Sequence, residues 1–361
     1  MNGGHHLQAL YTDAVELLKQ LIATPSFSKE EDKTALILEH FFRDRYIIHE
    51  RHLNNVWCHN KFFDAAKPTL LLNSHHDTVK PNQFYSRDPF EPVIEQGRLY
   101  GLGSNDAGGP LVSLIAAFRY YYDFPDLTCN LVLAATAEEE ISGPNGIESI
   151  LRLLPVIDAA IVGEPTQMNL AVAEKGLLVL DCTVYGKAGH AAREEGDNAI
   201  LKALKDVNWF TTFIFPKVSP TLGPVKMNIT VINTDNKAHN VVPAECRFVV
   251  DVRVTDDYSH EDILAIIQRY VACEVKPRSL RLRSSKIALD HPLVLAGLKS
   301  GKITYGSPTT SDQALIPVAS LKCGPGDSAR SHTADEYIYL EEIKEGIATY
   351  IDMIGEVGFK V

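Results

Sequence analysis

Several continuous apolar runs, each ending in acidic or histidine side chains, constrain the fold of this chain more than any other feature. These runs lie at 68–78 (PTLLLNSHHDT), 127–140 (LTCNLVLAATAEEE) and 158–166 (DAAIVGEPT). Continuous apolar runs are typical of strands that are buried on both faces, as in parallel sheets. Between the first two, residues 108–124 have a helical composition, opened by glycines and ended before Pro125. The alternation predicts an α/β fold whose mixed, mostly parallel sheet is covered by helices.

The pattern changes after Gly176. Alternating apolar and polar residues, typical of an antiparallel sheet with one face in solvent, follow at 177–189, 225–233 and 247–255. Helical spacing is found at 198–213 and 259–274, and the buried-strand style returns at 319–326 before a closing amphipathic helix at 339–357. A chain of 361 residues is long enough for two domains. We therefore predict a discontinuous α/β domain, 1–176 and 287–361, interrupted by an inserted α+β domain at 177–286.

Two further helices are predicted near the start of the chain. Apolar residues recur at helical spacing in 7–21 and 33–42, and a turn-like segment, TPSFSKEE, separates the two stretches. In that segment Ser28 and Glu31 have the spacing of a capping box, in which the serine caps the helix that follows. We expect Ser28 to cap the second helix.

Composition and charge exclude several functional classes. The net charge of −11 argues against a general binder of nucleic acid or anionic membranes, because both reward a basic surface. No apolar run reaches the roughly 18 residues that a membrane span needs, and the first residues lack the basic-then-apolar order of a signal peptide. The six cysteines are scattered without a paired motif, which favours a reducing compartment. We expect a cytoplasmic protein.

Candidate metal ligands follow the predicted strands. His75 and Asp77 come at the end of the first run and, two residues apart on a strand, project to the same face, whereas His76 projects to the other. Because sites in open α/β sheets form at the carboxyl ends of strands, we expect these side chains to meet further candidates. Those candidates are Asp106 in the glycine-rich segment 100–109, Glu138, Glu139 and Glu140 after the second run, Glu164 after the third, and His332 in 324–337.

This combination of side chains predicts a divalent-metal site. Each element alone has an ordinary interpretation: an acidic run such as 138–140 often starts a solvated helix, and GLGSNDAGG lacks the spacing of a dinucleotide-binding loop. Together they would place several carboxylates in one space, where like charges are unfavourable without a cation. Imidazole and carboxylate ligands without a thiolate suit Zn²⁺, Mn²⁺ or Co²⁺.

Motifs along nearly the whole chain resemble one enzyme family. They are SHHDT, YGLGSNDAGG, AEEEISG, GEPT, AEKG, GKAGHAA, HNVVPAE, DVRV and GPGDSARSHTADEY. The chain in this respect is similar to the acetylornithine deacetylase, succinyl-diaminopimelate desuccinylase and aminoacylase family of co-catalytic zinc hydrolases. The resemblance implies the two-domain fold, with the inserted domain mediating a homodimer.

The resemblance also implies a ligand set for two divalent ions, Zn²⁺ with Co²⁺ or Mn²⁺ as alternatives. In it Asp106 bridges both ions. His75 and Glu164 complete one ion, and Glu140 and His332 complete the other.

Catalytic and substrate-binding roles follow from the same resemblance. Glu139 matches the general base, and Asp77 the residue that orients the ligand His75. His190 matches a histidine that stabilises the oxyanion in the partner subunit's site. Asn240 and Arg253 match positions that bind the substrate carboxylate, and Lys175 a substrate contact.

Among the activities of this family, the chain length and the ending GPGDSARSHTADEY favour removal of the acetyl group from N-acetyl-L-ornithine, a step of arginine biosynthesis. Glu138 and Asp312 are candidates for an acidic pocket that would hold the ornithine ammonium group. The alternatives are an N-succinyl-L-ornithine or other N-succinyl-amino-acid desuccinylase, a broad dipeptidase or aminoacylase, and a non-catalytic binding module on the same fold. In each enzymatic case the partner is a small N-acyl amino acid or peptide.

Overall fold

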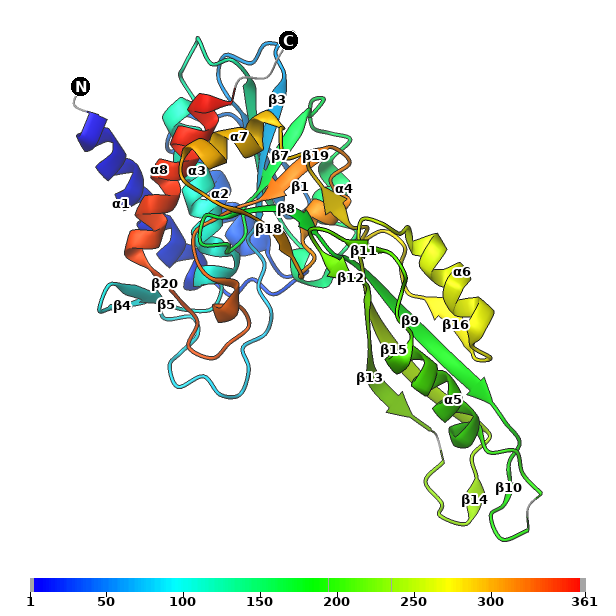
Figure 1. Cartoon of the computed structure of the whole chain (residues 1–361). Coiled ribbons are helices and arrows are strands. Elements are labelled where there is room, and N and C mark those ends of the chain that lie inside the picture. The colour runs from blue at the N-terminus through cyan, green and yellow to red at the C-terminus, as the bar shows by residue number, and fades with distance from the viewer. Residues whose placement is uncertain (1–2, 194, 235, 358–361) are drawn as a thin grey trace. The chain divides into compact units, whose positions relative to one another are not determined.

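The structure is a computed structural model that describes residues 3–193, 195–234 and 236–357 (Figure 1). The chain forms two compact units. The first unit comprises the chain up to Val172, Lys286–Tyr305 and the residues from Ser311 onward. The second comprises Ala173–Ser285 and the short return Gly306–Thr310. The sequence pattern placed the inserted domain at 177–286 and gave no sign of the return segment.

The first unit is built on a nine-stranded sheet with the order β1-β2-β6-β3-β7-β19-β8-β17, in which β18 also pairs with β8. The four strands at its centre run parallel: β6 (Asn130–Thr136), β3 (Thr69–His75), β7 (Ala159–Val162) and β19 (Ala319–Lys322). The antiparallel pairs of β2 with β6 and of β8 with β19 lie on either side of them. The outer strands are β1 (His49–His52), β2 (Asn55–His59), β8 (Leu170–Glu174), β17 (Ser285–Lys286) and β18 (Thr304–Ser307). The predicted α/β fold class is confirmed.

Helices cover both faces of this sheet, which explains why its central strands are apolar throughout. Leu70 and Leu72 of β3 pack into the larger core, whereas Leu71 packs into a second core on the opposite face with Ile147 and Ile150 of α4. On the larger side α3 packs against both α1 and α8, as Figure 1 shows. The helices of the unit are α1 (Gly3–Ile22), α2 (Asp32–Arg43), α3 (Gly109–Tyr121), α4 (Ile147–Ile150), α7 (Pro292–Lys299) and α8 (Leu340–Glu356).

The predicted cap of α2 is wrong. Glu31, not Ser28, occupies the position before the helix. The Ser28 hydroxyl instead donates a 2.7 Å hydrogen bond to a carboxylate oxygen of Asp77. A serine hydroxyl can satisfy either a main-chain amide or a carboxylate, and sequence spacing does not distinguish the two.

A small three-stranded sheet joins two distant parts of the first unit. It has the order β20-β5-β4, with β4 at Val93–Glu95, β5 at Arg98–Tyr100 and β20 at Tyr337–Tyr339. Tyr100 pairs with Tyr337. The glycine-rich segment that leaves β5 therefore lies beside the segment that enters β20.

The second unit is a four-stranded antiparallel sheet with two helices on one face. The sheet has the order β13-β15-β9-β16, so β13 (Lys226–Asn233) and β16 (Glu274–Pro277) are its edges around β15 (Glu245–Val254) and β9 (Gly176–Tyr185). Alternate residues of β9, such as Leu178 and Leu180, are buried, and helices α5 (Ala199–Thr212) and α6 (His260–Tyr270) share their core. Two short ladders join β10 (Gly189–His190) to β14 (Val241–Val242), and β11 (Val218–Ser219) to β12 (Gly223–Pro224). Among the described helices of the chain, none combines the length and apolar character of a membrane span.

Candidate metal centre

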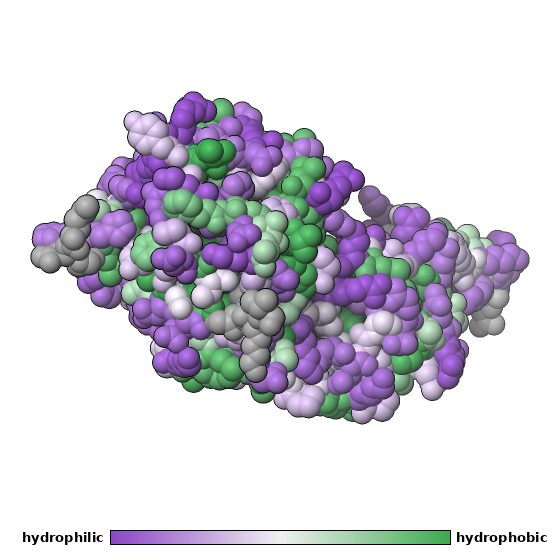
Figure 2. Space-filling model, turned by 90° about the horizontal axis from the view of Figure 1, so that it is seen from above, coloured by the Kyte–Doolittle hydropathy of each residue, from purple (hydrophilic) through white to green (hydrophobic). Residues whose placement is uncertain are grey.

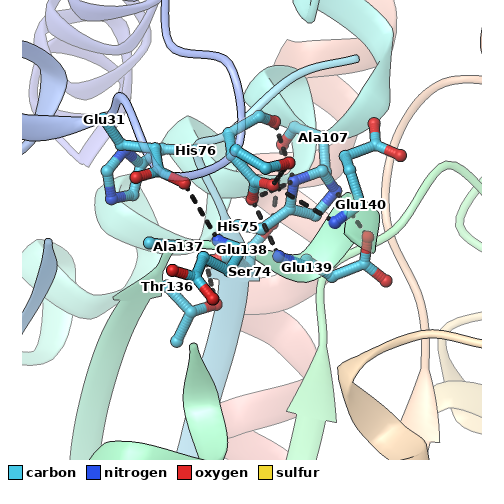
Figure 3. Close-up of polar contacts among 12 residues, drawn as sticks. Glu31, Ser74, His75, His76, Ala107, Thr136, Ala137, Glu138, Glu139 and Glu140 are labelled. Carbon is cyan, nitrogen blue, oxygen red and sulfur yellow. Dashed lines mark hydrogen bonds and ion pairs between the residues drawn. The ribbon is translucent and has the colours of Figure 1, made fainter. Parts of the chain in front are cut away.

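The candidate ligands of the first unit lie where its central strands end. His75 is the last residue of β3, directly opposite Thr136 at the end of β6. Glu139 and Glu140 begin the short turn η2 (Glu139–Ile141) that follows β6, and Figure 3 shows both beside His75. Glu164 follows β7. Parallel strands in adjacent positions therefore bring these side chains to one edge of the sheet.

Two candidate ligands come from loops. Asp106 belongs to the π-turn η1 (Ser104–Gly108), and His332 lies in the loop after β19. One Asp106 oxygen, Oδ1, is 3.4 Å from His75 Nε2, and the other, Oδ2, is 3.7 Å from His332 Nε2. The two imidazoles therefore face opposite oxygens of a single carboxylate.

Each imidazole also faces further carboxylates. His75 Nε2 lies 3.7 Å from Glu164 Oε1 and 3.8 Å from Glu139 Oε2. His332 Nε2 lies 3.0 Å from Glu140 Oε2. Ligand atoms of His75, Asp106 and Glu140 lie within 4.8 Å of one another, and so do those of His75, Glu139 and Glu164.

Asp77 organises the acidic turn rather than acting on His75 alone. Its two carboxylate oxygens accept the main-chain N–H groups of Glu139 and Glu140, at 3.1 and 3.2 Å. The ring nitrogen Nδ1 of His75 is 3.0 Å from the main-chain oxygen of Asp77 and 3.4 Å from its carboxylate. The ring is therefore oriented mainly by the peptide carbonyl, whereas the carboxylate positions two neighbouring glutamates.

Burial makes the cluster costly for its carboxylates. It raises the pKa of Glu139 well above its ordinary value, with Glu164 and Asp312 adding to the rise. Burial and then the charge of Asp106 raise the pKa of Glu164 to about 8. The pKa of Glu140 is raised chiefly by burial as well. Without a cation, this site resists holding all of its acids ionised.

The two histidines offset the negative charge of these carboxylates by holding protons. Burial alone would lower the pKa of His75, but the charge of Glu139 and the nearby carboxylate of Asp106 outweigh it and raise the pKa well above its ordinary value. The hydrogen bond with Glu140 raises the pKa of His332 to about 9. Burial alone would raise the pKa of Asp106, but the nearby His75 imidazole lowers it.

The donor atoms fit a bound divalent cation. His75 is only 1% exposed, and its Nε2 atom has no hydrogen-bond partner among the described residues. An unpartnered buried nitrogen surrounded by carboxylate oxygens is the environment in which imidazole binds Zn²⁺ or a similar ion. Such a cation would replace the protons that the metal-free cluster retains.

This electrostatic balance predicts that the stability of the metal-free protein and its affinity for metal change in opposite directions with pH. Glu164 rises from an ordinary pKa of 4.5 to about 8, and His332 from 6.5 to about 9. Both groups bind protons more tightly in the folded state, so their contribution to stability is present at low pH and is lost as pH rises through these values. We expect the metal-free protein to lose thermal stability from about pH 5 to pH 9, while its affinity for Co²⁺ rises. Thermal unfolding and chelator competition across this range measure both; a metal-free protein more stable at high pH would contradict the prediction.

Four predicted site residues belong to the second unit, so their relation to the cluster stays a prediction. Arg253 makes a bidentate pair with Asp251 in its own unit. The Lys175 ammonium donates to the carbonyl of Pro224. His190 is in the β10 ladder with its side chain exposed, and the carbonyl of Asn240 accepts the N–H of Ala191.

The acidic pocket expected for an ornithine ammonium group is not supported. The carboxylate of Glu138 is buried and accepts hydrogen bonds from the main chain and side chain of Asn145. Asp312 is buried as well and accepts a 2.8 Å bond from the Thr136 hydroxyl. Both carboxylates are committed inside the first unit, so neither is free to contact a substrate.

The sequence indicates Glu31 only as part of a capping box and does not single out Glu336, yet the buried carboxylates of both bond the main chain around the cluster. Glu31 accepts the N–H of Glu138, immediately before Glu139, as Figure 3 shows. Glu336 accepts the N–H of Asp106. The sequence shows charge but not burial, so neither glutamate can be recognised from it as a buried acid beside a candidate ligand.

Comparisons with known proteins agree with this geometry. A family model described as Peptidase family M20/M25/M40 matches residues 71–356. Succinyl-diaminopimelate desuccinylase of Buchnera aphidicola subsp. Acyrthosiphon pisum is 30% identical over 265 residues, which cover 69% of this chain and 70% of the relative. Succinyl-diaminopimelate desuccinylase 2 of Ruegeria sp. is 28% identical over 277 residues, covering 72% and 69%.

Solved structures share the fold at lower identity. Aminopeptidase PepT from Bacillus cereus superposes with a TM-score of 0.79 at 18% identity, covering 96% of this chain and 98% of the other. A dinuclear metal-binding peptidase of the M20 family from Bacillus subtilis gives 0.72 at 14% identity, covering 96% and 98%. Since the family model spans well over half of the 361 residues, this chain is a hydrolase that belongs to peptidase family M20/M25/M40.

Proposed function

We propose that this hydrolase uses two divalent metal ions, Zn²⁺ by preference, to remove the acyl group from an N-acyl-L-amino acid. The observation that carries the proposal is Asp106, whose two oxygens face His75 and His332 separately. That arrangement suits a carboxylate that bridges two ions. His75 and Glu164 would hold one ion, and Glu140 and His332 the other.

The protein side chains divide the remaining chemistry. When bound, the two ions lower the pKa of water and polarise the amide carbonyl. Glu139 would take the proton from the attacking water and deliver it to the leaving amine nitrogen. Asp77 holds the main chain of Glu139 in place. His190 would stabilise the negative charge that develops on the carbonyl oxygen.

Cations of the second unit support a substrate that carries carboxylates. Burial and then the charges of Lys226 and Arg253 lower the pKa of Lys175, which means that three cationic groups lie near one another. A bound carboxylate would relieve this repulsion, and Arg253, whose Nε and Nη2 atoms already pair with Asp251, would contribute to its binding through Nη1. We propose that Arg253, Asn240 and Lys175 bind the substrate carboxylate.

The acyl group is the least constrained part of the substrate. N-acetyl-L-ornithine follows from the sequence resemblance, but Glu138 and Asp312 do not provide its ammonium pocket. Two relatives are named for an N-succinyl substrate, and a succinyl carboxylate would suit the cationic group described above. We therefore place N-succinyl-L-amino acids ahead of N-acetyl-L-ornithine, and a dipeptidase or aminoacylase activity third.

A panel of substrates tests this order. The metal-loaded enzyme should turn over N-succinyl-L-ornithine or N-succinyl-L,L-diaminopimelate with a higher kcat/KM than N-acetyl-L-ornithine. Preference for one acyl group over another rests on a few contacts worth ~1–3 kcal/mol, or about 10–200-fold. Faster turnover of dipeptides than of every N-acyl amino acid would favour the peptidase alternative, and no turnover of any substrate would favour a binding module.

We also propose a homodimer formed through the second unit. β13 is an edge strand, and edge strands with unpaired main-chain groups readily pair with another chain. Four apolar side chains in this region are at least half exposed: Val231 and Ile232 on β13, and Leu201 and Leu204 on α5. On the face in Figure 2, hydrophobic residues lie in small groups and in one longer band among hydrophilic ones. These four exposed apolar side chains lie on neighbouring elements and together offer a surface for association with a second chain.

Sedimentation measurements test the dimer. The wild-type protein should sediment as two chains, and Val231→Lys with Leu204→Asp should give one chain without loss of helix content. The matched control is Val156→Lys, at an exposed apolar position of the first unit, which should stay dimeric. A monomeric wild type at micromolar concentration would contradict the proposal.

A cytoplasmic location stays a prediction, in keeping with the six free cysteines.

A further inference from the structure

The Glu336 carboxylate binds three main-chain N–H groups of the segment that carries Asp106. Its Oε1 accepts the N–H of Asn105 at 2.8 Å and that of Asp106 at 2.9 Å, and its Oε2 accepts the N–H of Gly103 at 3.1 Å. Glu336 is only 2% exposed. Successive main-chain N–H groups that converge in this way form a concave anion-binding site, which here is filled by a side chain of the protein itself.

The fold brings this carboxylate to the turn. Glu336 directly precedes β20, and its carbonyl accepts the N–H of Gly101, which extends the β5–β20 pairing by one bond. Gly103 has a φ of +75°, and a Cβ atom there would come within 2.6 Å of a methyl group of Thr78. Only glycine suits this position, and its conformation turns the Gly103 N–H toward Glu336.

A second connection joins the same turn to the segment before His332. The Asn105 side chain accepts the N–H of Asp327 at 3.0 Å and donates to the Asp327 carbonyl at 3.0 Å. It also approaches the Ser331 hydroxyl at 3.4 Å. The turn that carries Asp106 and the loop that carries His332 are therefore held as one assembly, with Glu336 on one side and Asn105 on the other.

We propose that Glu336 is a positioning residue for the metal centre, holding the main chain at Asp106 so that its two oxygens face His75 and His332. The inference rests on the proposed metal centre, and it assigns a role to a residue that contacts neither ion nor substrate. Asp106 must direct its oxygens in two directions at once, so a small rotation of its main chain would move both away from their imidazoles. A neutral glutamine cannot replace the carboxylate, because its NH₂ group would face an N–H donor.

Metal binding by substituted proteins tests the role without relying on catalysis. Co²⁺ alone is the probe, measured by chelator competition and by its visible absorption spectrum. We expect Glu336→Gln to weaken Co²⁺ binding by about 10–100-fold, the usual effect of removing a group that orients a ligand, and to change the spectrum. Glu336→Asp keeps the negative charge, but its side chain is shorter, so its Co²⁺ affinity should also stay below that of the wild type.

Asp206→Asn is the matched control. Asp206 is a buried carboxylate of the second unit that accepts the main-chain N–H groups of Ala272 and Cys273. Its substitution should lower thermal stability while leaving Co²⁺ affinity and spectrum at wild-type values. Unchanged affinity in Glu336→Gln, or an equal loss in both variants, would overturn the proposal. A wild-type protein that binds no Co²⁺ would instead contradict the metal centre itself.

Discussion

Replacing Glu139 with alanine should reduce kcat by about 10²–10⁴-fold or more, the usual contribution of general acid–base catalysis, while the protein keeps both metal ions. The carboxylate lies within 3.8 Å of His75 Nε2, yet the ligand sets proposed for the two ions are complete without it. Its position in the turn is held by the main chain, through Asp77, so truncating the side chain should leave the ligands in place. Steady-state kinetics together with metal analysis of the purified variant measure both quantities.

Glu138→Gln is the control for this variant. Glu138 is the adjacent buried glutamate, and a glutamine there keeps an oxygen that can accept from Asn145. Its activity should fall far less than that of Glu139→Ala. If Glu139→Ala turned over substrate at the wild-type rate, Glu139 would not be the base. If it lost its metals, Glu139 would be a ligand, which is compatible with its distance from Glu164 and His75.

Replacing Asp106 with alanine should remove both metal ions and abolish activity. Asp106 has one oxygen 3.4 Å from His75 Nε2 and the other 3.7 Å from His332 Nε2, so neither ion would keep its full set of proposed ligands without it. A ligand present at 100 times its Kd stabilises a protein by about 2.7 kcal/mol. The increase in unfolding temperature that Co²⁺ gives to the wild type should therefore be absent. Metal analysis after dialysis and thermal unfolding with and without Co²⁺ measure the effect.

Asp312→Asn is the matched control for Asp106. Asp312 is also a buried carboxylate, but it bonds Thr136 and is not among the proposed ligands. Its substitution should leave the metal content unchanged and keep the stabilisation by Co²⁺. Retention of two ions by Asp106→Ala would exclude a bridging role, and retention of one would show that the two ions bind independently.

The sequence was sufficient to predict the α/β fold class, because apolar runs without alternation have few explanations other than strands covered on both faces. The grouping of His75, Glu140 and Glu164 follows from the same reasoning, since each lies at or shortly after the carboxyl end of a parallel strand. These features depend on local pattern and on the common direction of neighbouring strands.

The hydrophobic and charge pattern of the sequence does not predict contacts between loops. Ser28 had the spacing of a cap but bonds Asp77, and Glu138 and Asp312 had the charge of substrate contacts but are buried with other partners. Glu336 lies in the same segment as His332, yet its bonds run to residues more than 200 positions earlier. Such pairings depend on how distant segments meet, which charge and spacing along the chain do not encode.

The order of the proposed ligands along the chain has a consequence for biosynthesis. Four of them precede Ala173, where the second unit begins, and His332 follows the whole of that unit. A chain still emerging from the ribosome would therefore present an incomplete set of the proposed ligands until the second unit and His332 have been translated. The ion proposed to depend on His332 could be captured in its final form only after the whole of the second unit has been synthesised.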